Sequence, residues 1–325
     1  MQSLIELKEF INKQIQDLPL PEKPVNLYEP FRYIMELGGK RIRPAMLILA
    51  GKAFHGTESE LRDAALAIEI FHNFSLVHDD IMDEAPKRRG KETVHTKWDE
   101  NIAILTGDVM LIEAYKYLGR LSDRAFKPCF EVFTNSAKDV CEGQVRDLVY
   151  ERMEEITVDQ YIEMIRQKTA ALVGCALKMG TIIGGADKAQ ADKMYTFGEY
   201  LGISFQLKDD YLDAFPEGEN FGKKVGGDIL ANKKTYLFLK ALEGADMKQK
   251  GELLDWFSQR DVKDPQEKID RVCEIFVATG AKQATNEKML EYYHLALNAL
   301  NETSMLEEHK NQFEELAGFL TERIV

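Results

Sequence analysis

The spacing of apolar residues over three long stretches constrains the fold of this chain more than any other feature. Residues 156–180, 190–215 and 266–325 carry apolar side chains at i, i+3, i+4 and i+7, for example at Tyr161 and Met164. This spacing places the apolar side chains along one side of an α-helix. We find neither the alternation typical of a strand nor a rhythm of alternating strands and helices. We therefore predict an all-α fold, a single-domain bundle of many helices.

Prolines and glycines indicate where the helices end. Four of the nine prolines lie within residues 19–30, so we predict that the first helix ends near Gln16 and that a bent connector follows. Further connections are predicted at residues 37–44, 84–93 and 215–228, with a solvated loop or short helices at 243–268.

Length, charge and cysteine content exclude several classes of protein. With 325 residues, of which 45% are apolar, the chain can bury a sizeable core, and we assign residues 1–325 to one domain. No apolar run could span a bilayer and the first residues are amphipathic and acidic, so we expect a cytoplasmic protein. The net charge of -13 argues against general nucleic-acid binding. None of the four cysteines forms a CxxC pair, so no disulfide framework or structural zinc site is indicated.

Two acidic segments, "HDDIMDE" and "LKDDYLD", share one spacing of carboxylates. The two triplets are Asp79, Asp80 and Asp83, and Asp209, Asp210 and Asp213. On a helix, the first and last carboxylates of each triplet lie on one face, one turn apart. A single copy would be more typical of a solvated helix face, but two copies embedded in apolar sequence need a cation to offset their repulsion. We predict a magnesium site between two facing helices, completed by phosphate and water.

Basic residues in glycine-containing connections suggest the anion that would join these cations. They are Lys40, Arg41 and Arg43 after Gly38-Gly39, Arg88 and Arg89 after the first triplet, and Lys223 and Lys233 after the second. Arginine binds phosphate oxygens with two parallel hydrogen bonds, and lysine adds a point charge. One such cluster alone would more often form surface salt bridges. Together with the aspartates, the clusters predict a polyphosphate ligand.

The segment before the first triplet carries candidates for two further roles. His72 lies two helical turns before Asp79 on the same face, and it fits a core histidine and a ligand of the site equally well. Phe74 and Ser75 precede Asp79 by five and four residues, and Phe71 lies one turn further back. An aromatic residue at such a place is most often core, but here it could form the floor of an apolar pocket.

Several ordered motifs resemble the trans-isoprenyl diphosphate synthases, or polyprenyl synthetases, over nearly the whole chain. They are "GGKRIRP", "LVHDDIMDEAPKRRG", "RQKTAAL", "FQLKDDYLDAF" and "FGKKVGGDILANKKT". The resemblance implies an all-α bundle around a deep central cavity, a homodimer, and three magnesium ions. It implies that the protein condenses isopentenyl diphosphate with an allylic diphosphate (dimethylallyl, geranyl or farnesyl).

The resemblance also implies roles for individual residues. Asp79, Asp83 and Asp209 would hold the magnesium ions, with Asp80, Asp210 and Asp213 supporting them. The other contacts of the allylic diphosphate would be Arg88, Lys168, Thr169, Gln206, Lys223 and Lys233. The isopentenyl diphosphate site would comprise Lys40, Arg43, His72 and Arg89. The catalytic set would be Asp79, Asp80, Asp83, Asp209 and Asp210 with Arg88, Lys168 and Lys223.

Three departures from the family pattern concern the second half of the chain. Asn232 stands where the family commonly has glycine, and asparagine is the next best residue for a left-handed cap. Tyr236-Leu237 replaces a common Leu-Pro pair, which alters how the following helix begins. The chain ends in "TERIV" and lacks the basic tail of some members, so the resemblance does not imply a lid role for this end.

The residues before the first triplet bear on product length. Phe74 at the fifth position, the small Ser75 at the fourth and the absence of an insertion resemble short-chain enzymes. We predict geranylgeranyl diphosphate (C20) as the main product, with farnesyl diphosphate (C15) as the alternative. A class I terpene cyclase would be expected to have an asparagine-serine-glutamate motif in place of the second triplet. A non-catalytic subunit of a heteromeric synthase could lose its aspartates, and here both triplets are complete.

Overall fold

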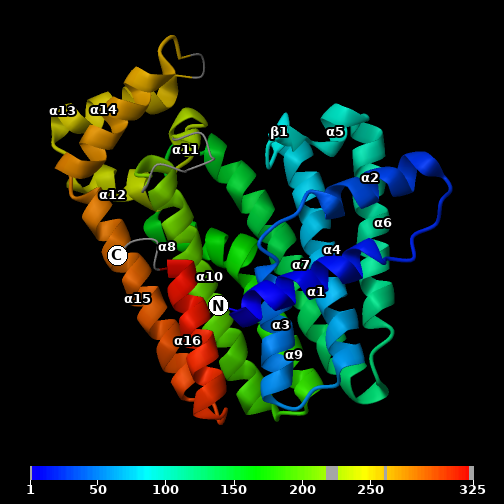
Figure 1. Cartoon of the computed structure of the whole chain (residues 1–325). Coiled ribbons are helices and arrows are strands. Elements are labelled where there is room, and N and C mark those ends of the chain that lie inside the picture. Colours follow the sequence, from blue (N-terminus) through cyan, green and yellow to red (C-terminus); the bar gives the residue numbers. More distant parts are fainter. Residues whose placement is uncertain (1, 217–225, 260–261, 322–325) are drawn as a thin grey trace. The chain divides into compact units, whose positions relative to one another are not determined.

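The computed structural model describes residues 2–216, 226–259 and 262–321 of the chain (Figure 1). Nearly all of the regular structure in these residues is α-helical, which confirms the predicted fold class. The chain divides into two compact units. Unit 1 comprises Met1–Ala137, Leu172–Tyr195 and Thr303–His309, and unit 2 comprises Lys138–Ala171, Thr196–Glu302 and Lys310–Val325.

Unit 1 is built around the long helix α4 (Glu58–Met82), which packs against α3 (Ile42–Ala53) and α6 (Glu100–Leu118) (Figure 1). A cap residue, Thr57, precedes α4, and Glu84, with a φ of 50°, follows its end. The unit also contains α1 (Gln2–Gln16), α2 (Val25–Glu36), α5 (Val94–Lys97), the first part of α7 (Asp123–Arg152), most of α9 (Ala171–Gly184) and the start of α10 (Lys188–Ala214). Helix α1 ends where the sequence predicts.

Two of the predicted connections are wrong in part. Residues 84–93 were expected to be a loop, but β1 (Lys87–Arg88) and β2 (Lys91–Glu92) form a short antiparallel hairpin. The two turn residues have φ values of 53° and 77°, as a tight hairpin turn requires. Strands of two residues are too short to show alternation. In the segment 37–44, helix α3 already begins at Ile42.

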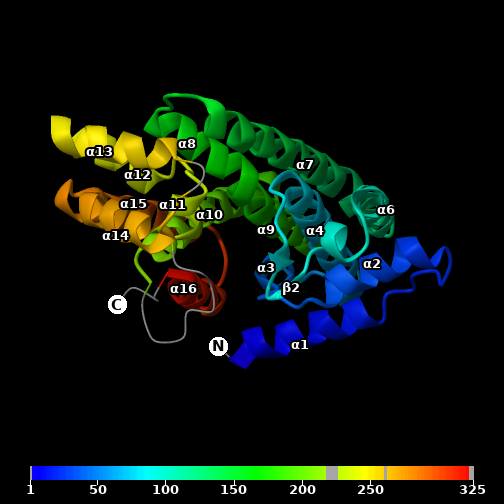
Figure 2. The ribbon, with the colours of Figure 1, turned by 90° about the horizontal axis from the view of Figure 1, so that it is seen from above.

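Unit 2 contains the remaining elements. They are the rest of α7 and α10, α8 (Val158–Ile165), the π-helix η1 (Arg166–Ala170), α11 (Gly227–Leu230), α12 (Tyr236–Gly244), α13 (Met247–Ser258), α14 (Pro265–Ala278), α15 (Ala281–Asn301) and most of α16 (Glu307–Thr321). Helices α12, α13, α14 and α15 lie side by side (Figure 2) and enclose a core that includes Phe238, Leu253 and Phe276. Residues 243–268 thus include the whole of α13, where a loop or short helices were predicted.

In the predicted segment 266–325, the described residues 266–321 form most of α14 followed by α15 and α16, so the continuous apolar pattern covers three helices. In the described part of the chain, no helix is both long and apolar enough to cross a membrane.

Candidate active site

The middle aspartate of the first triplet has a basic partner within unit 1. Asp80 lies near the end of α4 and its side chain is only 3% exposed. Arg88, on β1, donates from Nε to one carboxylate oxygen (2.8 Å) and approaches the other with Nη2 (2.7 Å). The short hairpin thus places a guanidinium against the buried carboxylate, which neutralises one of the three charges of the triplet.

The outer aspartates of the first triplet occupy successive turns. The backbone N–H of Asp83 donates to the carbonyl of Asp79 (2.8 Å), and Asp83 forms the C-cap of α4 with a helical conformation. Asp79 is half-buried and Asp83 is exposed. Their carboxylates are hard oxygen donors of the kind that magnesium prefers. Among the described residues of either unit, no three histidine, cysteine, aspartate or glutamate side chains form a metal-binding group. Magnesium is usually held by one or two carboxylates together with phosphate oxygens and water.

Four arginines lie close enough to His72 to act on its charge. Burial, followed by the positive charges of Arg43, Arg89, Arg88 and Arg41, lowers the pKa of His72 well below its usual value. Nη1 of Arg43 lies 3.3 Å from Nε2 of His72. The buried Nε of Arg43 has no hydrogen-bond acceptor among the described residues. We call His72, Arg43, Arg88 and Arg89 the arginine cluster, and its charge suits an anion.

The fourth arginine, Arg41, has a structural role. Its guanidinium pairs with Glu69 of α4 (2.5 Å) and donates to the carbonyl of Met35 (2.6 Å) and to Asn12 of α1 (3.0 Å). Arg41 is buried and has a left-handed backbone, with a φ of 52°. These bonds fix the turn that leads into α3, and therefore the position of Arg43 two residues later.

The two glycines before this turn allow close approach by the hairpin. Arg89 donates to the carbonyl of Gly38, and a Cβ on Gly39 would lie 3.1 Å from the Arg89 guanidinium. Both glycines have positive φ values. Lys40, the next residue, is exposed. The structure thus brings "GGKRIRP" and the arginines after the first triplet together.

Aromatic rings continue along α4 away from the aspartates. The ring of Phe74 lies 4.8 Å from that of His78 and 5.4 Å from that of Phe71. Phe71 is fully buried and packs edge-on against Phe133 of α7 (5.2 Å), so it fits the interpretation of core. Phe74 and Ser75 are half-buried. Phe133 was missed in the sequence, because only folding places α7 beside α4.

The second triplet lies in unit 2, on α10, and its middle aspartate is again buried. Asp210 accepts hydrogen bonds from the hydroxyl of Tyr161 and from Nε2 of Gln206 (2.9 Å). Thr169 in turn donates to Oε1 of Gln206 (3.0 Å). Burial and the nearby Asp228 raise the pKa of Asp210 well above its usual value. Three of the predicted residues thus form one hydrogen-bonded network, to which Tyr161 is an addition from the structure.

The last aspartate of the second triplet accepts hydrogen bonds from the segment that begins at residue 226, where the described part of the chain resumes. Asp213 accepts from the backbone N–H groups of Gly227 (3.1 Å) and Asp228 (2.9 Å) at the start of α11. Asp209, the first carboxylate of this triplet, is half-buried. A further predicted residue, Lys223, lies outside the residues that the structure describes.

Lys168 lies in the π-helix, and its ammonium is 2.5 Å from the carboxylate of Asp147 on α7. A Cβ on Gly143 would lie 2.4 Å from the backbone nitrogen of Lys168, so this glycine is what allows α7 to approach. Such π-helical turns are frequent at functional sites. Asp147 was missed because nothing in the sequence pairs it with residue 168.

The turn between α11 and α12 carries Lys233, which is half-buried. Asn232 has a φ of 57°, so the expectation of a left-handed asparagine is confirmed. Helix α12 begins at Tyr236 after the cap residue Thr235, so a helix forms here without the proline common in the family. The last four residues of "TERIV" lie outside the described residues.

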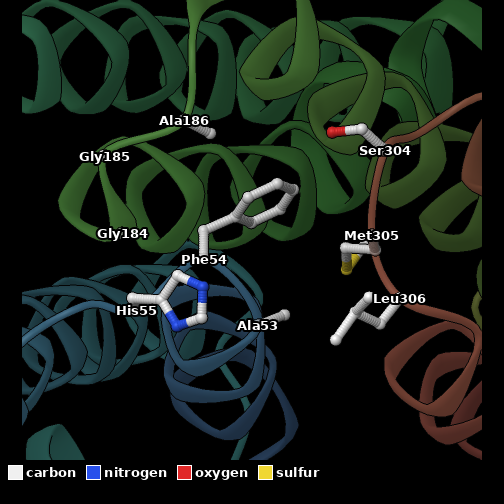
Figure 3. A pocket seen from close by; sticks show the side chains of 9 residues that line it. All are labelled: Ala53, Phe54, His55, Gly184, Gly185, Ala186, Ser304, Met305 and Leu306. Carbon is white, nitrogen blue, oxygen red and sulfur yellow. The ribbon is translucent and has the colours of Figure 1, made fainter.

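Unit 1 also contains a cavity of about 360 Å³ (Figure 3). It lies where α3 and α9 end, and it is lined by Phe54, His55, Met305 and their neighbours. Arg43 lies at the opposite end of α3, ten residues before Ala53 of the cavity lining, which corresponds to roughly 15 Å at a helical rise of about 1.5 Å per residue. The cavity contains none of the predicted site residues.

Comparison with known proteins identifies relatives along almost the whole chain. Residues 24–276 match the family model described as polyprenyl synthetase. The chain is 35% identical to a short chain isoprenyl diphosphate synthase of Methanothermobacter thermautotrophicus, over 99% of this chain and 98% of the relative. It is 34% identical to a geranylgeranyl pyrophosphate synthase of Geoglobus acetivorans, over 97% and 96%. A crystal structure of a geranylgeranyl pyrophosphate synthase superposes with a TM-score of 0.94 at 42% identity, covering 98% of each chain.

Proposed function

The chain belongs to the polyprenyl synthetase family and is a prenyltransferase, and we propose that it makes geranylgeranyl diphosphate from isopentenyl diphosphate and an allylic primer. The names of its relatives support C20 as the main product. We propose that one domain, residues 1–325, carries this activity. The observation that supports the function most directly is the arginine cluster beside the first triplet, where the buried Nε of Arg43 finds no acceptor in the part of the chain that the structure describes. An oxygen of a bound diphosphate would act as the acceptor for this N–H group.

Family members need a divalent metal, and we propose three magnesium ions held by Asp79, Asp83 and Asp209. The pairing of Asp80 with Arg88 and of Asp210 with Tyr161 supports this division of roles, because it commits each middle carboxylate to another partner. Bound magnesium would neutralise the charge that develops on the leaving diphosphate. The carboxylate donors fit such a hard cation.

The other site residues divide into two groups, one for each substrate. We propose that Arg88, Lys168, Thr169, Gln206, Lys223 and Lys233 bind the allylic diphosphate, and that Lys40, Arg43, His72 and Arg89 bind isopentenyl diphosphate. Because its pKa is lowered, His72 is neutral at pH 7 and can accept a hydrogen bond from Arg43 or donate one to a phosphate oxygen.

The reaction needs no nucleophilic side chain. The bond between C1 of the allylic group and its diphosphate oxygen breaks, and the electron pair leaves with the diphosphate. The double bond of isopentenyl diphosphate then forms the new bond to C1, and its C2 loses a proton to the released diphosphate. Arginine and lysine side chains stabilise the leaving group, and an apolar wall protects the cation from water.

The products from labelled isopentenyl diphosphate with dimethylallyl, geranyl and farnesyl primers test this function. We expect C20 diphosphate from each primer, and none when EDTA removes divalent cations. Accumulation of C15 would favour the farnesyl diphosphate alternative. Cyclic hydrocarbons would indicate a terpene cyclase. Condensation that requires a second protein would indicate a subunit of a heteromeric enzyme.

We propose that the protein forms a homodimer in the cytoplasm. Within unit 1, apolar side chains of α6 and α7 are exposed; they are Ile104, Leu105, Ile112, Phe126 and Phe130. Contact between Tyr115 and Phe130 joins the two helices, so these residues form one surface of the kind that interfaces bury. Light scattering should show a dimer that Ile112→Asp weakens. Val277→Asp is the matched control, because Val277 on α14 is equally exposed (56% against 58%).

A further inference from the structure

Lys268, on α14 of unit 2, is a fully buried lysine. Its ammonium donates to Oδ1 of Asn232 (2.5 Å) and lies 5.6 Å from the ring centroid of Phe257, which stacks on Phe238. Burial lowers the pKa of Lys268. A buried amine is unfavourable unless a partner accepts its hydrogen bonds. The contact with Asn232 therefore decides whether this lysine can be accommodated.

Asn232 is held at both ends of its side-chain amide. Oδ1 accepts from Lys268, and Nδ2 donates to the carbonyl of Gln259 (3.0 Å), where α13 ends. Its backbone is left-handed, a conformation that glycine adopts freely and that other residues disfavour. One hydrogen bond accepted and one donated by its side chain thus hold Asn232 in this conformation.

The left-handed residue sets the direction of the chain that carries Lys233. The N–H of Lys233 donates to the carbonyl of Asp228 (2.9 Å), and the N–H of Thr235 donates to the carbonyl of Lys233 (3.0 Å). A change of conformation at Asn232 would break these bonds and move Lys233, because the two residues share a peptide bond.

We infer that Lys268 is a positioning residue, which holds the left-handed turn at Asn232 and thereby presents Lys233 to the allylic diphosphate. This inference rests on the proposed function, because it takes the binding role of Lys233 from it. The Lys268–Asn232 pair would do in this chain what glycine does by its own conformational freedom. It follows that Lys268 should affect KM for the allylic substrate only while residue 232 is not glycine.

A double-mutant cycle tests this dependence. Lys268→Met, Asn232→Gly and the double variant are compared with the wild type in KM for geranyl diphosphate, in KM for isopentenyl diphosphate and in thermal midpoint. We expect Lys268→Met to raise KM for geranyl diphosphate about fivefold, the order of effect expected when a strained turn relaxes. KM for isopentenyl diphosphate should not change. In the Asn232→Gly background, Lys268→Met should leave both KM values unchanged.

Two controls separate positioning from general stability. Lys268→Arg keeps a donor and should retain a KM near the wild-type value. If Lys268→Met does not fold, Asn232→Ala, which removes the acceptor of Lys268, should raise KM for geranyl diphosphate and not for isopentenyl diphosphate. Lys310→Met removes another buried lysine of unit 2, on α16, and should lower the thermal midpoint without raising KM for geranyl diphosphate. An equal rise in KM in both backgrounds, or a rise shared by both substrates, would overturn the inference. Failure of the wild type to condense the substrates would instead overturn the proposed function.

Discussion

Nη1 of Arg43, a residue on the first turn of α3, lies 3.3 Å from Nε2 of His72, a residue in the middle of α4. Burial, followed by the charge of Arg43 at this distance and the charges of three further arginines, opposes protonation of the ring. His72 is therefore neutral in the folded protein at pH values at which it would be charged in the unfolded chain. This relationship makes the stability of unit 1 depend on pH.

Below about pH 6.5 the unfolded chain binds a proton at His72 more readily than the folded protein does. The stabilising effect of the neutral ring is thus present above pH 6.5 and is lost as the pH falls. We expect the free energy of unfolding to decrease less between pH 7 and pH 5 in His72→Gln than in the wild type. Urea denaturation at several pH values measures this, with the exposed His294→Gln as control. Equal slopes for wild type and His72→Gln would contradict the prediction.

Arg43 and His72 are assigned to one substrate only. Arg43→Ala and His72→Ala should therefore raise KM for isopentenyl diphosphate by about tenfold or more, the effect of losing one charge-assisted hydrogen bond, and change KM for the allylic substrate little. Initial rates with each substrate varied in turn measure the two constants. Equal effects on both substrates would show that the assignment is wrong.

Asp79→Ala or Asp209→Ala should abolish turnover and leave the fold intact. Each change removes a proposed cation ligand and relieves repulsion between carboxylates. Condensation is measured at saturating magnesium, and circular dichroism follows the fold. Asp255→Ala, an exposed aspartate on α13, is the control and should retain full activity. Rates near the wild-type value in either variant would exclude the proposed metal ligands.

Removal of Arg88 should destabilise the protein as well as weaken substrate binding. Arg88→Ala leaves the buried carboxylate of Asp80 unpaired, which costs on the order of 3 kcal/mol. In the double variant Arg88→Ala/Asp80→Asn, much of this stability should return, because no buried charge remains. Urea unfolding compares the variants. A double variant no more stable than Arg88→Ala would argue against the ion pair as the cause.

Phe74→Ala should lengthen the product to C25 or beyond. The half-buried ring packs between His78 and Phe71, five residues or about 7.5 Å along α4 from Asp79, so its removal frees room along the path of the growing chain. Chromatography of dephosphorylated products gives the chain length. An unchanged product would place the stop at Phe71 or at Phe133, whose ring packs on it.

The sequence by itself determined the fold class, because the helical period of apolar residues continues through long segments nearly free of proline. It also predicted a cation site at the two triplets, because repeated carboxylates in apolar surroundings need cations. The left-handed conformation of Asn232 was expected from its place in the family pattern, where glycine is common, and the structure confirms it. The first two inferences rest on local spacing, which the order of residues contains.

Only the tertiary structure decided which charge neutralises which. Asp80 pairs with Arg88, 8 positions away, and Asp147 pairs with Lys168, 21 positions away. A hydrogen bond joins Lys268 to Asn232 across 36 positions. Each contact depends on how a helix approaches another helix, a hairpin or a turn. At Gly143 the approach requires the absence of a side chain. Residue spacing does not encode such approaches, because they are set by the packing of the whole core.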